Sequence, residues 1–337
     1  MNSVIRALAR DSLRRIPLAR KLWNKLKVLR SALTSGPHAR MPDGRHLKML
    51  AGTEHARFAL PIDYTPSRDF QPRYGYTHPP IRALETWFER HSSGYAEFVA
   101  YLRSLDISHI AMAPETRSSS KPSWTGGPIC AFDSLALYGM IRKLAPRCYL
   151  EIGSGMTTCF ARQAVVDGGM TTRIVSVDPE PRSEIDSICD EVIRDGLETC
   201  DLGIFEKLEA NDIVFFDGSH RSFMNSDVTV FFIDVLPRLK PGVIVHIHDI
   251  HLPWDYPEWA KNWYWNEQYL LAVYLIGHMN SISVLLPTAF VCRSHVLEQC
   301  MRSPFADLGS ANDSWRGGGS MWFTHGGRPR EMNGARG

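Results

Sequence analysis

The residues with the most chemistry to offer follow two apolar segments in the second half of the chain. Segment 211–219 contains Asp217 and is followed by His220, and segment 241–249 ends in His248 and Asp249. Carboxylates and imidazoles can take a proton from a hydroxyl group or bind a divalent cation. If both segments are parallel strands, their carboxyl ends lie at one edge of a sheet. We therefore expect these four side chains to form a catalytic cluster.

The run His-Ile-His-Asp-Ile-His at 246–251 is similar to the signature of dinuclear metallohydrolases, but its spacing differs. Asp249 follows His246 by three residues where that signature has four. In an extended strand this places the acid on the opposite side from the preceding histidines. We therefore expect His246 to point away from Asp249 and to pack within the protein.

A second motif is the glycine loop after the apolar segment 148–153. Gly153, Ser154, Gly155 and Thr157 fall between a predicted strand and a predicted helix, where a backbone can approach a ligand closely. A dinucleotide loop needs Gly or Ala where this chain has Thr158, and Glu151 at its entrance would repel a diphosphate. A carboxylate there suits a ligand with an ammonium and a sulfonium group. The residues thus favour S-adenosylmethionine over a nicotinamide dinucleotide.

Asp178 ends the next apolar segment and is the expected partner of the ribose hydroxyls. An acid at the end of the second strand can accept hydrogen bonds from both hydroxyls of an adenosine ribose. Either adenosine cofactor has this ribose, so Asp178 does not choose between them. We expect Glu151, Gly153, Ser154, Gly155, Thr157 and Asp178 to bind the cofactor.

From residue 130 onward, strand-like and helix-like segments alternate. The predicted strands are 148–153, 173–178, 211–219, 241–249, 281–286 and an edge strand at 318–325; the predicted helices are 131–145, the segment after Ser154, 184–192, 227–239 and 265–277. Such alternation is typical of parallel βαβ units. We predict an α/β fold: a Rossmann-like, doubly wound, mostly parallel sheet with helices on both faces, preceded by a helical and irregular N-terminal extension.

On these motifs, the chain resembles the class I S-adenosylmethionine-dependent methyltransferases. The resemblance covers about residues 130–325 and rests on E-I-G-S-G at 151–155, V-D at 177–178, F-D-G-S-H at 216–220 and L-K-P-G-V-I-V-H-I-H-D at 239–249. The nearest branch is the bacterial small-molecule and sugar O-methyltransferases, which are similar to catechol O-methyltransferase.

The resemblance implies a cation site that the residues alone leave open. Metal-dependent relatives bind a divalent cation with an Asp after the fourth strand and two adjacent residues after the fifth. The matching residues are Asp217, His248 and Asp249. Because imidazole suits Mg²⁺ poorly, Mn²⁺ or another transition metal is the alternative ion. Without a metal, His220 or His248 is the candidate general base.

Composition adds an uneven charge distribution and a division into four segments. Residues 1–40 hold ten of the 38 basic residues and one of the 36 acids, so the remainder is net acidic. The predicted segments are a basic amphipathic helical segment at 1–34, an accessory region at 35–129, the cofactor domain at 130–325 and a disordered tail at 326–337. Segment 1–34 could pack on the protein, contact an anionic membrane or act as a targeting peptide. The overall charge of +2 argues against a nucleic-acid partner.

The sequence thus predicts a cytoplasmic enzyme that methylates a hydroxyl group on a small molecule or glycan precursor. The seven scattered cysteines fit free thiols in a reducing compartment. The aromatic segment 254–265 could form a lid over a flat acceptor or cap the sheet edge. Two alternatives stay open: a nicotinamide-dependent oxidoreductase, and a catalytically inactive module that contacts a membrane surface.

Overall fold

The computed structural model describes residues 71–114, 119–181, 184–298, 301, 304, 315 and 317–326. The predictions for segment 1–34 and for the tail after Gly326 lie outside these residues. The described residues from Pro72 onward belong to one compact unit.

A seven-stranded sheet forms the centre of this unit, in the order β3-β2-β1-β4-β5-β7-β6. The strands are β1 (Cys148–Ile152), β2 (Arg173–Val177), β3 (Glu191–Ile193), β4 (Ile213–Phe216), β5 (Ile244–Ile247), β6 (Ser283–Pro287) and β7 (Met321–Thr324). Strands β1 to β5 pair in parallel, and β7 runs antiparallel to both β5 and β6. The predicted Rossmann-like, mostly parallel sheet is confirmed.

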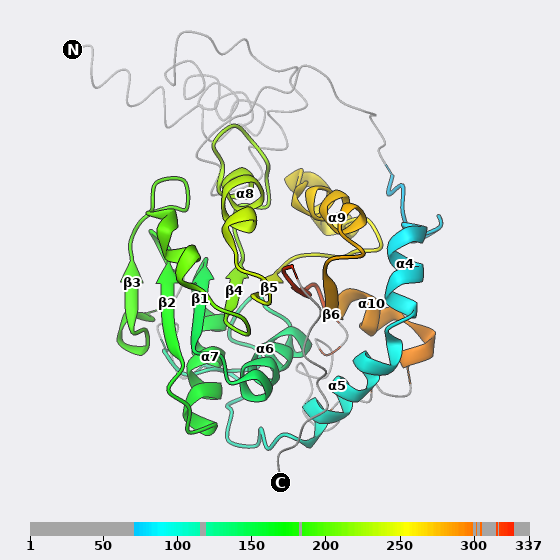
Figure 1. Cartoon of the computed structure of the whole chain (residues 1–337). Coiled ribbons are helices and arrows are strands. Elements are labelled where there is room, and N and C mark those ends of the chain that lie inside the picture. Colours follow the sequence, from blue (N-terminus) through cyan, green and yellow to red (C-terminus); the bar gives the residue numbers. More distant parts are fainter. Residues whose placement is uncertain are drawn as a thin grey trace, which may run out of the picture. The chain divides into compact units, whose positions relative to one another are not determined.

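Helices flank the sheet, and most begin or end where the sequence predicts (Figure 1). They are α6 (Ala131–Leu144), α7 (Met156–Asp167), α8 (Asp227–Val230), α9 (Glu267–Gly277) and α10 (Thr288–Arg293), with short helical turns η1 (Asp186–Ile188), η2 (Leu202–Lys207), η3 (Phe231–Val235), η4 (Leu236–Arg238), η5 (Glu258–Trp263) and η6 (His295–Leu297). The predicted helix 227–239 is α8 continued through the π-helical η3 and then η4. In Figure 1, α8 and α9 lie at the end of the sheet toward which the parallel strands point.

Two sequence predictions about the sheet are wrong. Segment 184–192 was expected to be a helix, but it contains only the turn η1 before the chain enters β3. The backbone N–H of Asp190 bonds to the carbonyl of Ile174, so pairing with β2 outweighs the local helical pattern. Segment 318–325 was expected at an edge, but β7 lies between β5 and β6, and all four of its residues are buried. At that end of the sheet the edge strand is β6.

The helical pattern at 81–105 is two helices, α4 (Arg82–Glu89) and α5 (Ser92–Ser104). The break falls at Arg90 and His91, and the Ser-Ser-Gly run at 92–94 begins α5. Leu84 and Phe88 of α4, with Phe98 and Leu102 of α5, are buried in the core of the unit. These helices are therefore packed parts of the same unit.

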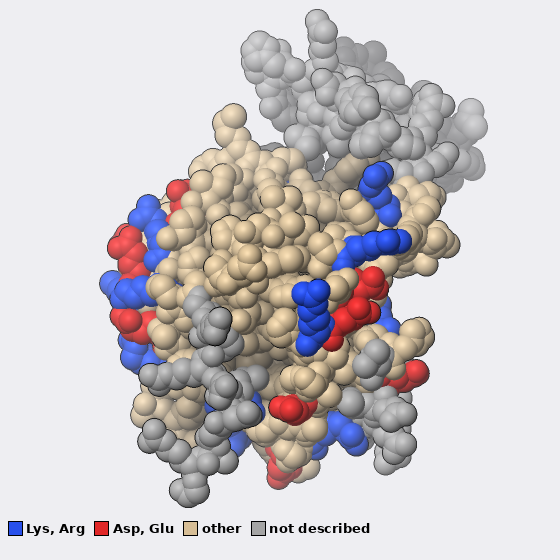
Figure 2. Space-filling view, turned by 45° about the vertical axis from the view of Figure 1, so that its right-hand side comes forward, with Lys and Arg blue, Asp and Glu red and all other residues tan. Residues whose placement is uncertain are grey.

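Helix α9 has apolar residues on its outer face as well as on its inner face. Leu271 and Leu275 are buried, whereas Leu270, Val273 and Ile276 are exposed. No Lys, Arg, Asp or Glu occurs at 268–292. Figure 2 shows a broad area without charged side chains between the charged margins of the visible face. No helix among the described residues is long and apolar enough to cross a bilayer.

His246 lies in the core, where its ring packs against aromatic side chains of the neighbouring strands. It is fully buried on β5, stacks on Trp322 of β7 with ring centroids 3.7 Å apart, and contacts Phe215 of β4. Neither ring nitrogen has a hydrogen-bond partner among the described residues. Burial lowers the pKa of His246 well below its ordinary value, and neighbouring His248 lowers it further. His246 is thus a neutral core residue, pointing away from Asp249 as expected.

Replacing His246 with Phe should make the fold less sensitive to acid. Because the pKa of His246 is lowered in the folded protein, its contribution to stability is complete above the unfolded-state pKa of about 6.5. That contribution falls with decreasing pH by up to about 1.4 kcal/mol per unit. Guanidinium unfolding at pH 7 and pH 5 should show a smaller loss in His246→Phe than in the parent. The control His278→Phe changes an exposed histidine, and equal losses in all three proteins would contradict the assignment.

Candidate active site

The parallel strands end at a cavity of about 360 Å³. Its lining residues are 126–129, 152–157, 177–180, 196–198, Asp217, Gly218, Asp227 and His248. Among the predicted cofactor residues, Gly153, Ser154, Gly155, Thr157 and Asp178 line this cavity, and Glu151 does not. Asp217 and His248 of the predicted catalytic cluster line the same cavity. Residues 126–129, which precede the predicted domain, also form part of its wall.

Gly153 stands where the loop after β1 meets the loop after β4. Its φ is +83°, and a Cβ atom added there would lie 2.1 Å from the carbonyl oxygen of Asp217. Only glycine combines this backbone conformation with so close an approach. The Ser154 N–H donates to Asp178 Oδ2 at 2.7 Å, and the Gly155 N–H donates to Thr158 Oγ1 at 3.0 Å. The loop is therefore tied to β2 and to the first turn of α7.

Glu151 lies beneath this loop, fully buried within β1. Its carboxylate accepts hydrogen bonds from the hydroxyls of Tyr149, Thr157 and Thr158. Burial raises the pKa of Glu151 to about 7, although the bonds from Thr158 and its other polar neighbours act in the opposite direction. Thr157 lines the cavity, so Glu151 reaches the ligand side through that hydroxyl.

Asp178 lies at the end of β2, as predicted, with both carboxylate oxygens bonded to backbone. Oδ2 accepts from Ser154 N–H, and Oδ1 accepts from Glu180 N–H at 2.8 Å. Glu180 itself lines the cavity. Glu180 is not among the residues predicted from the sequence, although an acid two residues after a strand could have indicated it.

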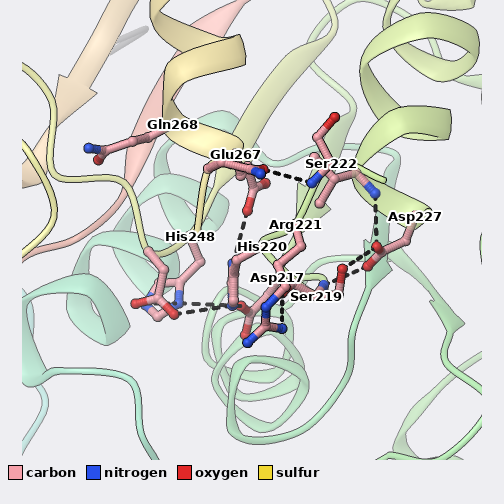
Figure 3. Close-up of polar contacts among 12 residues, drawn as sticks. Asp217, Ser219, His220, Arg221, Ser222, Asp227, His248, Glu267 and Gln268 are labelled. Atoms are coloured by element: carbon pink, nitrogen blue, oxygen red, sulfur yellow. Dashed lines mark hydrogen bonds and ion pairs between the residues drawn. The ribbon is translucent and has the colours of Figure 1, made fainter. Parts of the chain in front are cut away.

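The four predicted catalytic residues do come together at the strand ends, and Figure 3 labels three of them, Asp217, His220 and His248. His220 Nε2 lies 3.5 Å from Asp217 Oδ1 and 3.3 Å from Asp249 Oδ2. His248 Nδ1 lies 3.6 Å from Asp217 Oδ1 and 3.8 Å from Asp249 Oδ1. The two imidazoles therefore face one pair of carboxylates.

Two residues of this cluster have strained backbones. The φ angles are +61° for His220 and +54° for Asp249. Left-handed conformations at non-glycine residues cost about 1–2 kcal/mol each and are often found at functional sites. The His220 carbonyl accepts from the N–H groups of Asn266 and Glu267, which fixes this turn against the start of α9.

The acids around the cluster determine its protonation without a metal. Burial acts to lower the pKa of His248, but Asp249, Asp217 and Asp133 outweigh it and raise the pKa to about 10. Burial also acts to lower the pKa of His220. Glu267, Asp217 and Asp249 outweigh this effect, so the pKa of His220 is raised. His248 is then an imidazolium ion at neutral pH, and an imidazolium ion cannot act as a base.

The nearby His251 behaves differently from both. Burial lowers the pKa of His251 to about 3, with Arg293 contributing in the same direction. Its ring contacts the edges of Tyr256 and Trp259. His251 is therefore a neutral packing residue beside the cluster.

The aromatic segment 254–265 divides between packing and exposure. Tyr256 is buried, while Trp259 and Trp263 are about half exposed. Trp265 lies against the His220 ring with centroids 4.3 Å apart and contacts Trp259 at 5.2 Å. The Trp265 ring thus links the exposed Trp259 indole to His220, a contact that the sequence did not indicate.

The residues of the cluster suit a divalent cation. Asp217, His248 and Asp249 each offer one ligand atom, and these atoms lie within 4.8 Å of one another. His248 Nδ1 is buried and has no hydrogen-bond partner among the described residues. Two carboxylates and one imidazole are ligands that Mn²⁺ and other transition metals accept.

Comparison with known proteins agrees with this arrangement. Residues 150–250 match the sequence profile of a family described as "Methyltransferase domain". The matched region contains β1 with its glycine loop, Asp178 and the whole cluster through Asp249. No curated protein sequence matches the chain.

Solved structures similar to this chain include several methyltransferases. The O-methyltransferase TomG from Streptomyces achromogenes, in complex with S-adenosylmethionine, is 16% identical, with a TM-score of 0.32 over 60% of this chain and 87% of that one. Podospora anserina methyltransferase PaMTH1, bound to S-adenosylhomocysteine, is 15% identical, with a TM-score of 0.36 over 76% and 100%. An O-methyltransferase from Bacillus cereus, with S-adenosylhomocysteine, is 17% identical, with a TM-score of 0.33 over 60% and 90%. The fold assignment itself rests on the observed strand order.

Replacing Gly153 with Ala should disrupt the cavity, because the new Cβ would overlap the Asp217 carbonyl. Gly169→Ala is the matched control, since Gly169 also has a positive φ, +57°, but no atom lies within 4 Å of its added Cβ. The control should lose about 1–2 kcal/mol of stability from backbone strain alone. Denaturant unfolding should show a larger loss for Gly153→Ala, and calorimetry should show weakened S-adenosylhomocysteine binding in that variant alone. Equal behaviour of the two variants would refute the close approach.

Proposed function

We propose that the chain, which carries a methyltransferase domain of the S-adenosylmethionine-dependent class, methylates a hydroxyl oxygen of a small molecule or glycan precursor. One observation carries this proposal: the glycine loop and the acid–imidazole cluster border the same cavity. A ligand held by the loop therefore lies beside residues that can activate a hydroxyl group. When bound, S-adenosylmethionine supplies an electrophilic methyl group on a sulfonium.

The cofactor is held, in this proposal, by the residues predicted from sequence. These are Glu151, Gly153, Ser154, Gly155, Thr157 and Asp178, with Glu151 acting through the Thr157 hydroxyl. Asp178 and the added Glu180 offer carboxylate oxygens to the ribose hydroxyls from the end of β2. The acidic character of this wall suits a ligand that carries positive charge.

The loop suits a dinucleotide poorly, which argues against the oxidoreductase alternative. A diphosphate needs backbone N–H groups at the helix N-terminus. Here the N–H groups of Ser154 and Gly155 already donate to Asp178 and Thr158.

Activation of the acceptor falls to the cluster at the other wall of the cavity. Asp217 and His248 border the cavity, and Asp249 completes the carboxylate pair that faces both imidazoles. A divalent cation held by Asp217, His248 and Asp249 would lower the pKa of a nearby hydroxyl. The cation would also supply the positive charge that the protonated His248 otherwise provides, so His248 would then be neutral. The presence of this cluster also argues against an inactive module.

Two variants should separate cofactor binding from turnover. Asp178→Ala should weaken S-adenosylhomocysteine binding at least about tenfold, the equivalent of about 1.4 kcal/mol. Asp249→Ala should leave that affinity nearly intact and reduce methyl transfer at least about 100-fold, because it removes acceptor activation. Calorimetry measures the affinity, and release of S-adenosylhomocysteine in a small-molecule extract measures turnover.

The control for both variants is Asp234→Ala, which removes an exposed acid on η3. It should change neither quantity. Tight binding of NAD without binding of S-adenosylhomocysteine would favour the oxidoreductase, and full turnover by Asp249→Ala would remove the cluster from the reaction.

We also propose a cytoplasmic location with peripheral attachment through residues 1–34. All six cysteines that the structure describes are free thiols, which suits a reducing compartment. The many Lys and Arg residues of segment 1–34 would be attracted to anionic lipid. Deleting residues 1–34 should abolish co-sedimentation with vesicles containing phosphatidylserine and leave turnover on a water-soluble acceptor unchanged. Co-sedimentation that survives the deletion would contradict this attachment.

A further inference from the structure

Each histidine of the cluster lies between the shared carboxylate pair and a second buried acid. On the side away from Asp217 and Asp249, His220 Nδ1 lies 2.9 Å from Glu267 Oε2, as Figure 3 shows. His248 Nε2 lies 3.7 Å from Asp133 Oδ2. Glu267 begins α9, Asp133 belongs to the first turn of α6, and both side chains are at least 99% buried. Two different helices thus supply an outer acid for each imidazole.

The outer acid determines how His220 presents its other nitrogen. An ionised Glu267 at 2.9 Å accepts a hydrogen bond from His220 Nδ1, so the lone pair of a neutral ring resides on Nε2. That lone pair faces the carboxylates of Asp217 and Asp249 at 3.5 and 3.3 Å. A lone pair facing two negative charges at this range is unfavourable, so either a proton on Nε2 or a cation among these groups must offset the repulsion.

The distances suit a metal ion as that cation. Adjacent ligands around an ion at about 2.1 Å stand roughly 3.0–3.5 Å apart. The two contacts from His220 to the carboxylates, 3.3 and 3.5 Å, fall in this range, and the two from His248, 3.6 and 3.8 Å, are slightly longer. Independently, His248 Nδ1 is buried without a hydrogen-bond partner in the described part of the chain and faces the same carboxylates. Both imidazoles therefore direct one nitrogen toward the same pair of carboxylates.

His220 is better placed to bind an ion than to reach the acceptor. It is 7% exposed and does not line the cavity, whereas Asp217 and His248 do. Trp265 covers its ring. His246, on the same strand as the cluster, has no acid beside either nitrogen and stacks on Trp322. Burial of a histidine in this protein thus does not by itself bring carboxylates to it.

We propose that His220 is a fourth ligand of a divalent centre formed with Asp217, His248 and Asp249, and that Glu267 and Asp133 are its positioning residues. Carboxylates that hold the second nitrogen of a metal-bound imidazole fix its tautomer and orientation. Two imidazoles and two carboxylates select a transition ion such as Mn²⁺, Co²⁺ or Zn²⁺ over Mg²⁺. This metal centre rests on the proposed function in one respect: it uses Asp217, His248 and Asp249, the residues proposed to activate the acceptor.

Titration of the metal-free full chain with Co²⁺ tests the centre without any turnover. Calorimetry gives the affinity, and the visible absorption of Co²⁺ reports loss of an imidazole ligand. His220→Asn removes the ligand while tolerating the positive φ. Glu267→Gln keeps the shape of the positioning side chain but removes its charge. Both variants should weaken Co²⁺ binding by about 10- to 100-fold, and His220→Asn should also change the spectrum.

The matched control is Asp255→Asn, which neutralises a buried acid in the same region. Asp255 accepts hydrogen bonds from the N–H groups of Arg73 and Tyr74 and from the Tyr269 hydroxyl. It should bind Co²⁺ as the parent does. A parent chain that binds no Co²⁺, or His220→Asn with parental affinity and spectrum, would overturn the proposal. Parental affinity in Glu267→Gln would overturn the role of that acid.

Failure of this centre and failure of the proposed function give different results. Loss of the centre leaves S-adenosylhomocysteine binding to the parent intact, because that ligand is held by the loop and Asp178. A chain that binds Co²⁺ through His220 but binds no S-adenosylhomocysteine keeps the centre and loses the methyltransferase. Each variant is compared only after its unfolding midpoint shows that it is folded.

Discussion

The contact between Gly153 and the Asp217 carbonyl is the constraint on which the site depends. It requires a residue without Cβ, because an added methyl group would lie 2.1 Å from that oxygen. The contact brings the loop after β1 against the first residue after β4. The parallel pairing of β1 with β4 and of β4 with β5 then carries Asp249 to the same edge. Cofactor loop and acceptor cluster are therefore neighbours because of backbone packing.

The second constraint is electrostatic. Asp217, Asp249, Glu267 and Asp133 surround two imidazoles at the end of the sheet. Burying acids together is costly unless positive charge accompanies them. In the metal-free protein these acids raise the pKa of both histidines and so favour their positively charged forms. A divalent ion would satisfy the same demand and leave the imidazoles neutral, so the proposed cation binding and acceptor activation would have a common cause.

Sequence periodicity was sufficient for the parts of the fold that depend on local pattern. Buried parallel strands are apolar runs, and glycines between strand and helix mark the loop, so β1, β2, β4, β5 and the cluster at their ends were predictable. The strand β3 was missed because pairing with β2 overrides a helix-like pattern in 184–192. The place of β7 between β5 and β6 depends on long-range pairing that no local pattern records.

The supporting residues of the site were harder to predict than the cluster itself. Asp133 lies in a helix that precedes β1, and its approach to His248 depends on how α6 packs. Trp265 belongs to an aromatic run whose members look alike in sequence, and the sequence does not indicate that its ring lies against His220. Glu151 was expected at the mouth of the loop and instead lies beneath it, because β1 is buried along its whole length.

The most direct test of the central claim is the fate of a ¹³C-labelled methyl group. The protein is incubated with S-adenosylmethionine carrying that label and with a hydroxyl-rich extract of small molecules and glycan precursors, and the products are observed by ¹³C nuclear magnetic resonance. The account predicts a new methyl signal attached to oxygen, dependent on active protein. A label found on nitrogen or carbon, or none transferred to any extract component, would contradict it.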